Sequence, residues 1–260
     1  MTSTYRTSNE FQAIRDRVSE FAAGQGRVFR PSQLESIDVD PSVIRSMVGR
    51  QWWIRLRHGV YADTQAWETS ASDPTDRHLL QCAAAIIVLP LPTYAFGRTA
   101  GAVHGLPAPR GQLNELQLAR SLDTDPRALR GLVTSIGELP PVRIKTHDLT
   151  NDTVLTLDGI PTVSRDLAAI SAAATYEQEW ALSVLDGAAW QRPDSLETLA
   201  AIAEQWPRLR GIGTVRSVLP LVRSGAQTPL ESISRLRLLS AGLPEPVLQY
   251  PLHDRHGLIG

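Results

Sequence analysis

Residues 26–62 constrain the fold most, because two helix starts and a hairpin follow one another along this stretch. Pro31 stands where proline favours the first turn of a helix, and Asp40 and Pro41 can cap and open a second helix. Residues 53–57 then alternate like a half-buried strand, and a tight turn leads into a returning strand. Two short helices followed by a basic hairpin are typical of a winged helix-turn-helix, which presents its second helix to the major groove of DNA.

The predicted second helix and the hairpin carry the residues that we expect to contact DNA. Apolar residues recur at helical spacing from Val43 to Val48 and are expected to face inward, which leaves the polar side chains of this helix in solvent. The hairpin strand is expected to turn Ile54 and Leu56 inward and its arginines outward. The predicted DNA-contacting residues are therefore Ser42, Arg45, Ser46, Arg50, Arg55, Arg57 and His58. The alternative is a small helical domain that binds a protein, or that binds nothing.

The distribution of charge supports a DNA-binding segment near the N-terminus. The 260-residue chain has a formal net charge of −1, but residues 1–62 contain nine arginines and only six acidic residues. A local basic region on a nearly neutral chain is typical of DNA binding by one domain rather than by the whole surface. Lys145 is the only lysine, and because arginine predominates in every segment we give this bias little functional weight.

Cysteine content and hydropathy limit the other classes of protein. Cys82 is the single cysteine, which excludes a disulfide within the chain and a zinc site built from several cysteines. No apolar run reaches the length of a membrane-spanning helix, and the polar N-terminus does not resemble a signal peptide. We therefore expect a soluble, cytoplasmic protein with no membrane partner. No motif in the sequence requires a metal or another cofactor.

The chain divides into four predicted segments of an α+β fold with a helical C-terminal part. The winged helix-turn-helix takes residues 1–62 and begins with an amphipathic helix at 8–24, and a polar, turn-rich linker follows at 63–75. Residues 76–225 are expected to form a domain of helices around a small, mostly antiparallel sheet, and 226–260 form the last segment. After the N-terminal segment, the chain is expected to form helices at 75–89 (capped by Thr75), 96–104, 164–190, 195–206, 211–222 and 228–242. Strands are expected at 113–118, 132–136, 142–145 and 153–157.

Residues 25–62 resemble the N-terminal domain of AbiEi-type antitoxins from abortive-infection systems. The resemblance rests on the run Gly-x-hydrophobic-x-x-Pro-x-x-Leu at the start of this stretch and on Gly-Val-Tyr in the hairpin. Residues 97–107 resemble the helix that ends in Gly-Leu-Pro in the same family. In that family the N-terminal domain represses its own operon, and the larger C-terminal domain counteracts a nucleotidyltransferase toxin. The resemblance therefore implies a DNA-binding antitoxin that regulates its own transcription, with duplex DNA and such a toxin as partners.

Three polar residues outside this segment have both a chemical and a structural interpretation. His104 could act as a base, but no acid or nucleophile accompanies it, so a structural hydrogen bond at a helix end is favoured. Arg165 and Asp166 could form a partner-binding or catalytic pair. We favour a helix start instead, with Ser164 as the cap and Asp166 in the first turn.

The last segment resembles the opening of a very-short-patch-repair-like endonuclease domain of the PD-(D/E)xK fold. In that comparison Glu231 corresponds to the first acidic residue of the domain and Gln249 to a glutamine of its first strand. The later carboxylates that hold a divalent metal would follow beyond Gly260. Asp254 is expected in a turn and does not match any of them.

The same residues also form a helix start. Thr228, Pro229 and Glu231 have the pattern of a capping box, so we expect Glu231 to cap a helix rather than to bind a metal, with Arg235 and Arg237 facing outward. Glu231 is therefore only a weak catalytic candidate. Two alternatives to the antitoxin stay open: a truncated or decayed metal-dependent endonuclease with an AbiEi-like DNA-binding domain, and a protein-interaction module.

Overall fold

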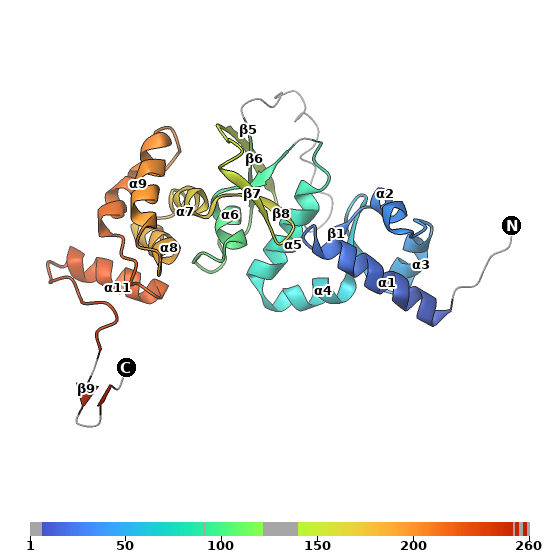
Figure 1. The fold of residues 1–260 in the computed structure, drawn as a ribbon, viewed down its shortest axis with the longest axis horizontal. Coiled ribbons are helices and arrows are strands. Elements are labelled where there is room, and N and C mark those ends of the chain that lie inside the picture. The colour runs from blue at the N-terminus through green and yellow to red at the C-terminus, as the bar shows by residue number, and fades with distance from the viewer. Residues whose placement is uncertain (1–6, 91, 122–139, 252, 255–256, 259–260) are drawn as a thin grey trace.

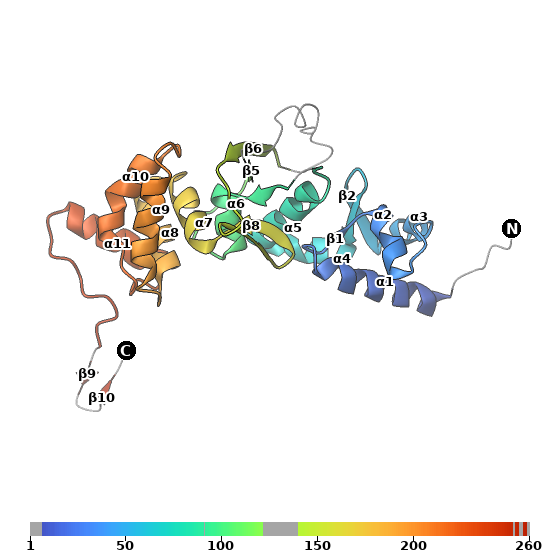
Figure 2. The same cartoon turned by 45° about the horizontal axis from the view of Figure 1, so that its top comes forward.

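The computed structural model describes residues 7–90, 92–121, 140–251, 253–254 and 257–258, and these form three parts in a row (Figure 1). The N-terminal unit, residues 7–63, lies at one end, a sheet with helices lies in the middle, and the helices that follow lie at the other end (Figure 2). The described part is α+β as expected, with helices α1 to α11 and three small sheets. No described helix is both long enough and apolar enough to cross a lipid bilayer.

The N-terminal unit combines three α-helices with a three-stranded antiparallel sheet. Thr7 and Glu10 form a capping box that starts the first helix, and Pro31 occupies the first turn of the second. The strand order is β1-β3-β2, so that β2 and β3 form a hairpin at one edge. The elements are α1 (Ser8–Ala23), β1 (Val28–Phe29), α2 (Pro31–Leu34), α3 (Val43–Gly49), β2 (Trp53–Arg57) and β3 (Val60–Asp63), with a 3-10 turn at Glu35–Ile37.

A small apolar core fixes α3 against the sheet. Leu34, Met47 and Trp53 are each at most 1% exposed, and the ring of Phe29 meets that of Trp53 edge-on at a centroid distance of 4.8 Å. Burying one such side chain stabilises the fold by roughly 1.5–3 kcal/mol. Val48 was expected to face this core, but it is 37% exposed. Met47 fills the inward position, and the next residue on a helix points about 100° away from it.

The segment 63–75, expected to be a turn-rich linker, is mostly helical. Asp63 accepts a hydrogen bond from the amide of Gln65 at 2.9 Å, and Asp73 accepts one from the amide of Thr75 at 2.8 Å, so an aspartate caps each of two helices. Thr75, the expected cap, lies in the first turn instead. The polar residues that suggested turns are helix caps and residues of short helices. These helices are α4 (Thr64–Thr69) and α5 (Pro74–Ile86), with a 3-10 turn at Ser70–Ser72 between them.

Both faces of the N-terminal sheet carry apolar contacts, because its second face packs on the middle of the chain. Leu56 and Val60 belong to the same apolar cluster as α5 and the central sheet. Two glycines with positive φ allow the close approach: a Cβ on Gly26 would lie 2.5 Å from Cβ of Ala83, and a Cβ on Gly159 would lie 2.4 Å from the nitrogen of Gly26. The expected division into domains stays a prediction.

The central sheet is mixed, and the expectation of a mostly antiparallel sheet is wrong. Its order is β6-β5-β4-β8-β7, in which β4–β5 and β7–β8 are antiparallel pairs and β5–β6 and β4–β8 are parallel pairs. Two of these strands have little sequence signal, because β4 is two residues long and β8 contains Pro161. The strand expected at 132–136 lies outside the described residues. The strands are β4 (Tyr94–Ala95), β5 (Leu116–Ser121), β6 (Val142–His147), β7 (Val154–Leu157) and β8 (Ile160–Val163).

Helices cover the sheet and connect it to the C-terminal part. α6 (Gly97–Val103) packs on β5 and on α7 (Arg165–Ala173), and α7 lies between the sheet and the last helices in Figures 1 and 2. Ser164 stands at the N-cap of α7, but its side chain makes no cap hydrogen bond. The expected capping role of Ser164 is therefore wrong in detail, although Asp166 does lie in the first turn.

The C-terminal helices are α8 (Gln178–Ala189), α9 (Ser195–Gln205), α10 (Ile212–Val218) and α11 (Pro229–Ser240). The capping box at the start of α11 is confirmed, since Glu231 Oε2 accepts a hydrogen bond from the amide of Thr228 at 2.8 Å and Thr228 Oγ1 accepts one from the amide of Glu231 at 3.3 Å. Arg237 faces outward as expected. The same expectation for Arg235 is wrong, because Asp186 of α8 forms an ion pair with its buried guanidinium.

A short hairpin follows α11. It pairs β9 (His253–Asp254) with β10 (Gly257–Leu258). Asp254, expected in a turn, is the last residue of β9 and lies opposite Gly257.

Candidate nucleic-acid interface

Helix α3 presents four of the predicted contact residues to solvent. Ser42, Arg45, Ser46 and Arg50 are all exposed, because Val43 and Met47 fix the opposite side of the helix in the core. The start of the helix is held by Asp40, whose carboxylate accepts hydrogen bonds from the amide of Ser42 at 2.8 Å and from its hydroxyl at 2.6 Å. The carboxylate repels phosphate at this end, so the middle and the end of α3 are better suited to an anionic partner.

The β2–β3 hairpin presents the remaining predicted residues unequally. Arg55 is exposed, and His58 is exposed in the turn that Gly59 permits by its φ of +69°. The ladder is irregular between Arg55 and Arg57, which pair with Tyr61 and Val60. Arg57 is half-buried, and its Nε has no hydrogen-bond partner in the described part of the chain. Burial lowers the pKa of Arg57.

A groove of about 610 Å³ brings together arginines from three elements. Arg50 follows α3, Arg55 lies on β2 and Arg15 lies on α1, and all three line the groove. The guanidinium of Arg50 lies over the ring of Phe11 at 4.4 Å from its centroid, which orients the charge through a cation–π contact. Glu68 of α4 is the acidic residue of this lining. The predicted residues outside the groove lining are Ser42, Arg45, Ser46, Arg57 and His58.

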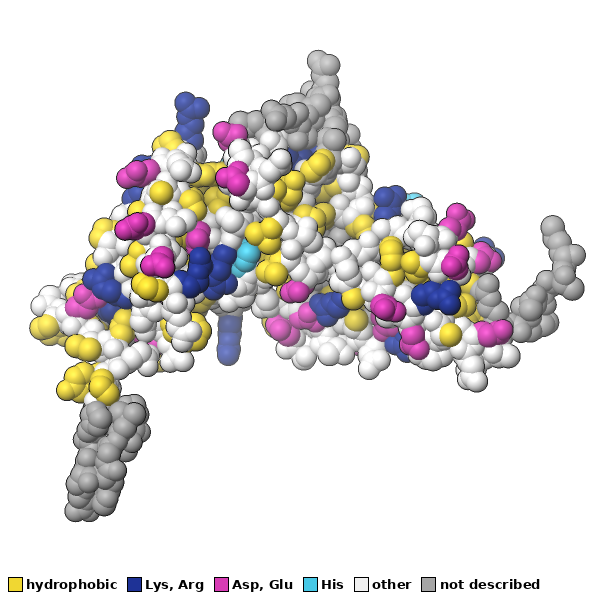
Figure 3. Space-filling view, viewed as in Figure 1, with side chains coloured by type: hydrophobic (Ala, Val, Ile, Leu, Met, Phe, Trp, Pro, Cys, Tyr) yellow, Lys and Arg dark blue, Asp and Glu magenta, His cyan; other side chains and the backbone are white. Residues whose placement is uncertain are grey.

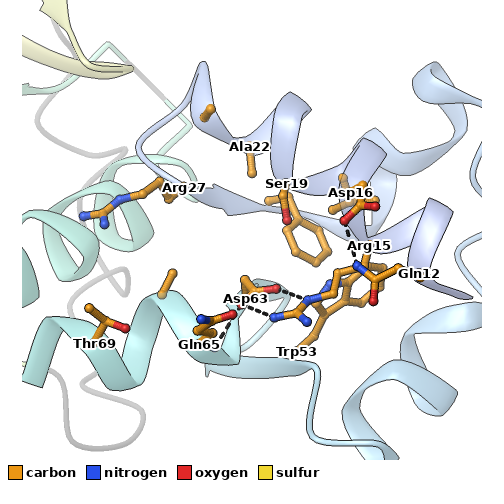
Figure 4. A pocket seen from close by; sticks show the side chains of 14 residues that line it. Gln12, Arg15, Asp16, Ser19, Ala22, Arg27, Trp53, Asp63, Gln65 and Thr69 are labelled. Atoms are coloured by element: carbon orange, nitrogen blue, oxygen red, sulfur yellow. Dashed lines mark hydrogen bonds and ion pairs between the residues drawn. The ribbon is translucent and has the colours of Figure 1, made fainter.

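Arg15 is the member of this groove that sequence analysis missed. Its guanidinium reaches from α1 to the carboxylate of Asp63, with Nε–Oδ2 and Nη2–Oδ1 distances of 2.5 and 2.8 Å (Figure 4). The hydrogen bond to Asp63 raises the pKa of Arg15. Because the partners are far apart in sequence, no local pattern could have indicated the pair. The carboxylate of Asp63 thus balances the charge of Arg15 in the groove wall, whereas Arg50 and Arg55 have no acidic partner among the described residues.

The Arg15–Asp63 pair also borders a second groove, of about 570 Å³, between α1 and α4 (Figure 4). Its floor contains Phe29 and Trp53 from the sheet. Burial alone would raise the pKa of Asp63, but the hydrogen bond and charge of Arg15, with the amides of Gln65 and Ala66, hold it below its ordinary value. The pair therefore stays ionised and ties α1 to the end of the hairpin.

The charge on the N-terminal unit is mixed rather than uniformly basic. On the face drawn in Figure 3, acidic side chains lie among the basic ones over this unit. A local set of arginines, rather than a broad field, is therefore what the surface offers to a polyanion.

The other candidates from the sequence have structural partners. His104 Nε2 lies 2.8 Å from the carbonyl of Val163, in agreement with the favoured structural hydrogen bond, and burial lowers the pKa of His104. Arg165 donates to the carbonyls of His104 and Gly187 at 2.7 and 3.1 Å. Asp166 instead forms an ion pair with Arg192, at an Nη1–Oδ1 distance of 3.1 Å, and it does not join Arg165 in a site.

Two further candidates are also accounted for. Glu231 caps α11 and accepts a hydrogen bond from Gln249 Nε2 at 2.9 Å. Burial raises the pKa of Cys82 to about 12, so its thiol stays protonated. Among the described residues, no cluster of three or more His, Cys, Asp or Glu is arranged to hold a metal ion. No observation on these residues favours the endonuclease alternative.

Comparison with known proteins gives a match over the N-terminal unit. Residues 16–62 match a family described as "Transcriptional regulator, AbiEi antitoxin". The matched residues begin inside α1 and end in β3, and they include α3 and both hairpin strands. This match does not extend to the last segment, and it gives no support to the expected likeness to an endonuclease domain.

Two curated relatives, the uncharacterized proteins MT2308 and Rv2248 of Mycobacterium tuberculosis, are each 33% identical to the chain over 119 residues. The alignment covers 45% of this chain and 44% of each relative, so less than half of either protein is compared. Residues 16–62, which include α3 and β2, are similar to the AbiEi family of transcriptional regulators.

Proposed function

We propose that the N-terminal unit is a winged helix-turn-helix that binds duplex DNA, and that the chain is a transcriptional regulator of the antitoxin type. In this proposal α3 enters the major groove, where Arg45 and Arg50 contact bases or phosphates. The β2–β3 hairpin is the wing, and Arg55, Arg57 and His58 contact the backbone or the minor groove.

One observation carries the proposal: the residues that match the regulator family are the same residues that hold the exposed arginines. Arg45, Arg50 and Arg55 are exposed and have no acidic partner among the described residues. Arginine forms paired hydrogen bonds with guanine or phosphate, so three unpaired guanidinium groups on one small unit suit DNA.

The test is binding to a labelled duplex taken from the region upstream of the protein's own gene, compared with a duplex of scrambled sequence. The full chain should bind the upstream duplex more tightly. Arg45→Ala and Arg50→Ala should each weaken binding by about 1–3 kcal/mol if the arginine meets a base, and by less if it meets only phosphate. Arg110→Ala is the matched control, because Arg110 is exposed but lies in the central part.

Failure of the full chain to bind either duplex at low salt would contradict the proposal. Equal losses for Arg45→Ala and Arg110→Ala would show that general charge, and not α3, drives binding. Loss of binding in the α3 variants alone, with Arg110→Ala unchanged, would support the interface.

We further propose that the remainder of the chain neutralises a nucleotidyltransferase toxin, as the family resemblance implies. The support is the description of the matched family as antitoxin regulators. A nucleotidyltransferase encoded beside this gene should arrest growth when expressed alone, and co-expression of the full chain should relieve the arrest. Arg45→Ala should still relieve it, since α3 is not needed for this step. Continued arrest with the wild-type chain would reject the toxin partner and leave the DNA proposal intact.

A further inference from the structure

A second concentration of positive charge lies in the central part, in a pocket of about 340 Å³. We call it the basic pocket and define it by Arg98, Gln117, Arg143, Lys145, Thr175 and Arg210, which all line it. Strands β5 and β6 form one wall, the start of α6 and the end of α7 form another, and the segment before α10 lines a third side. This pocket is separate from the candidate DNA interface, since the two share no residue.

The sheet register explains how two of the cations come to face the pocket together. Gln117 of β5 pairs with Arg143 of β6 in the parallel ladder, so their side chains emerge on the same face. Lys145 follows two residues after Arg143 and emerges on that face as well. Ile144 lies between Arg143 and Lys145 and turns to the opposite face. The only lysine of the chain is therefore placed beside an arginine over a cavity.

The Arg98 side chain is fixed in this wall by uncharged groups. Its Nε and Nη2 donate to the hydroxyl and the carbonyl of Thr175, each at 3.0 Å, and its Nη1 donates to Gln112 Oε1 at 2.6 Å. The guanidinium also lies 4.8 Å from the centroid of the Tyr176 ring. These contacts hold the group without neutralising it, so its positive charge acts on the pocket.

The pocket has more positive charge than its own acidic residue can balance. Glu115 is the carboxylate in the lining, and it pairs with Arg143 at 2.6 Å. Lys145 and Arg210 are exposed and have no ion pair within the described part of the chain. Counted over the described residues, they and Arg98 leave three cations without an acidic partner around one cavity, on a chain whose net charge is −1.

The uncharged part of the lining suits a planar or apolar group. Phe96, Leu118 and Leu209 line the cavity beside the cations. The ring of Phe96 stacks on that of His147, with a centroid distance of 4.5 Å. Small-molecule sites typically combine apolar walls with a few convergent polar groups, in cavities of about 300–1,000 Å³. The basic pocket has this composition and is near the lower end of this range.

We propose that the basic pocket binds a small ligand with two or more linked phosphate groups, of the nucleoside diphosphate class. Two linked phosphates carry two to three negative charges, which balance the positive charges of Arg98, Lys145 and Arg210. Lysine and arginine are common ligands for phosphate oxygens. The apolar wall around Phe96 accepts the base. A cavity of about 340 Å³ suits a small ligand better than the continuous backbone of a nucleic acid.

The experiment measures binding by the full chain with three probes: inorganic pyrophosphate, ADP and adenosine. Titration calorimetry at low ionic strength should give saturable binding of ADP and pyrophosphate with Kd below about 1 mM, and none of adenosine. Lys145→Gln combined with Arg210→Gln should weaken ADP binding at least tenfold. Both side chains are exposed and make no ion pair within the described residues, so the double variant should melt like the wild type; Arg110→Gln is the control and should bind ADP unchanged.

The arms of this test separate the sources of phosphate. Tighter binding of ADP than of pyrophosphate supports a nucleotide, and equal binding supports the linked phosphates but overturns the role of the apolar wall. No saturable binding of either probe, or binding unaffected by the double variant, overturns the site. Displacement of ADP by a short DNA duplex, with weaker duplex binding by the double variant, would also overturn it, because the pocket would then hold the DNA backbone. Failure of α3 to bind DNA has no bearing on any of these outcomes.

Discussion

Replacing Arg235 by alanine should destabilise the C-terminal helices strongly, although sequence analysis placed this side chain on the surface. Its guanidinium is 0% exposed and donates to Asp186 Oδ2 at 2.7 Å, to the carbonyl of Leu221 at 2.5 Å and to Glu245 Oε1 at 3.1 Å. The other oxygen of Asp186 accepts a hydrogen bond from the amide of Arg223 at 2.8 Å. Without the guanidinium, the buried carboxylate of Asp186 loses its counter-ion.

The expected cost follows from that unpaired carboxylate. Removing one partner of a buried ion pair costs about 3–5 kcal/mol, whereas replacing both partners by apolar residues of similar volume costs much less. Burial already raises the pKa of Asp186, and loss of Arg235 should raise it further. A carboxyl whose pKa is higher in the folded chain than in the unfolded chain favours folding when it is protonated. The free energy of unfolding therefore falls as the pH rises through the folded-state pKa. The penalty of Arg235→Ala should therefore be largest at neutral pH and should shrink toward acidic pH.

Hydrogen exchange of the amides in α8 and α11 measures this cost locally, which avoids assuming that the whole chain unfolds in one step. Arg237→Ala is the matched control, because Arg237 joins the same two helices through Glu179 at 2.8 Å but is 69% exposed. That control should change protection little. A variant with Asp186→Leu and Arg235→Met together should recover most of the protection. Equal effects of Arg235→Ala and Arg237→Ala would refute the reasoning.

Three further predictions concern the other contacts. Asp63→Asn should lower the Tm at neutral pH and should reduce the loss of stability on acidification. The pKa of Asp63 is lower in the folded chain than its unfolded value of ~4, so the carboxylate stabilises the fold at higher pH, and this stability disappears as the pH falls through the folded pKa. Thermal melts between neutral and acidic pH check this. Glu231→Ala should cost about 0.5–2 kcal/mol of stability by urea titration, and Glu231→Gln, which can still complete a capping box, should cost less. Gly159→Ala should cost more than about 1 kcal/mol of stability, because the new Cβ would meet Gly26 and because alanine is strained at a φ of +75°. Gly242 has the same φ but open space around it, so Gly242→Ala measures the cost of the backbone strain alone. A smaller loss of stability at Gly159 than at Gly242 would reject the close approach.

Local signals in the sequence predicted the elements that local contacts decide. The capping box at Thr228 and Glu231 involves residues three apart, and its hydrogen bonds are as expected. The exposed positions of α3 followed from the spacing of its apolar residues, and only Val48 departed from it. Even there, the error is one residue at the edge of the buried side.

Interactions between distant residues decided the features that sequence analysis missed. Arg235 is buried only because Asp186, on another helix, accepts its guanidinium. Arg15 became part of the candidate interface through Asp63, at the far end of the hairpin. The parallel pair β4–β8 of the central sheet depends on a two-residue strand whose partner follows much later in the chain. No periodicity or cap within a short window could have indicated these three features.

The salt dependence of DNA binding tests the central claim most directly, because it reports how many phosphates the N-terminal unit neutralises. Plotted as log K against log salt concentration, binding to duplex DNA should fall linearly, and Arg55→Ala should reduce the slope by about one unit if its guanidinium neutralises one phosphate. Arg110→Ala should leave the slope unchanged. No binding of the wild type at low salt would contradict the assignment of α3 and the β2–β3 hairpin as the DNA-binding surface, and an Arg55→Ala slope equal to that of the wild type would contradict the part of the hairpin in it.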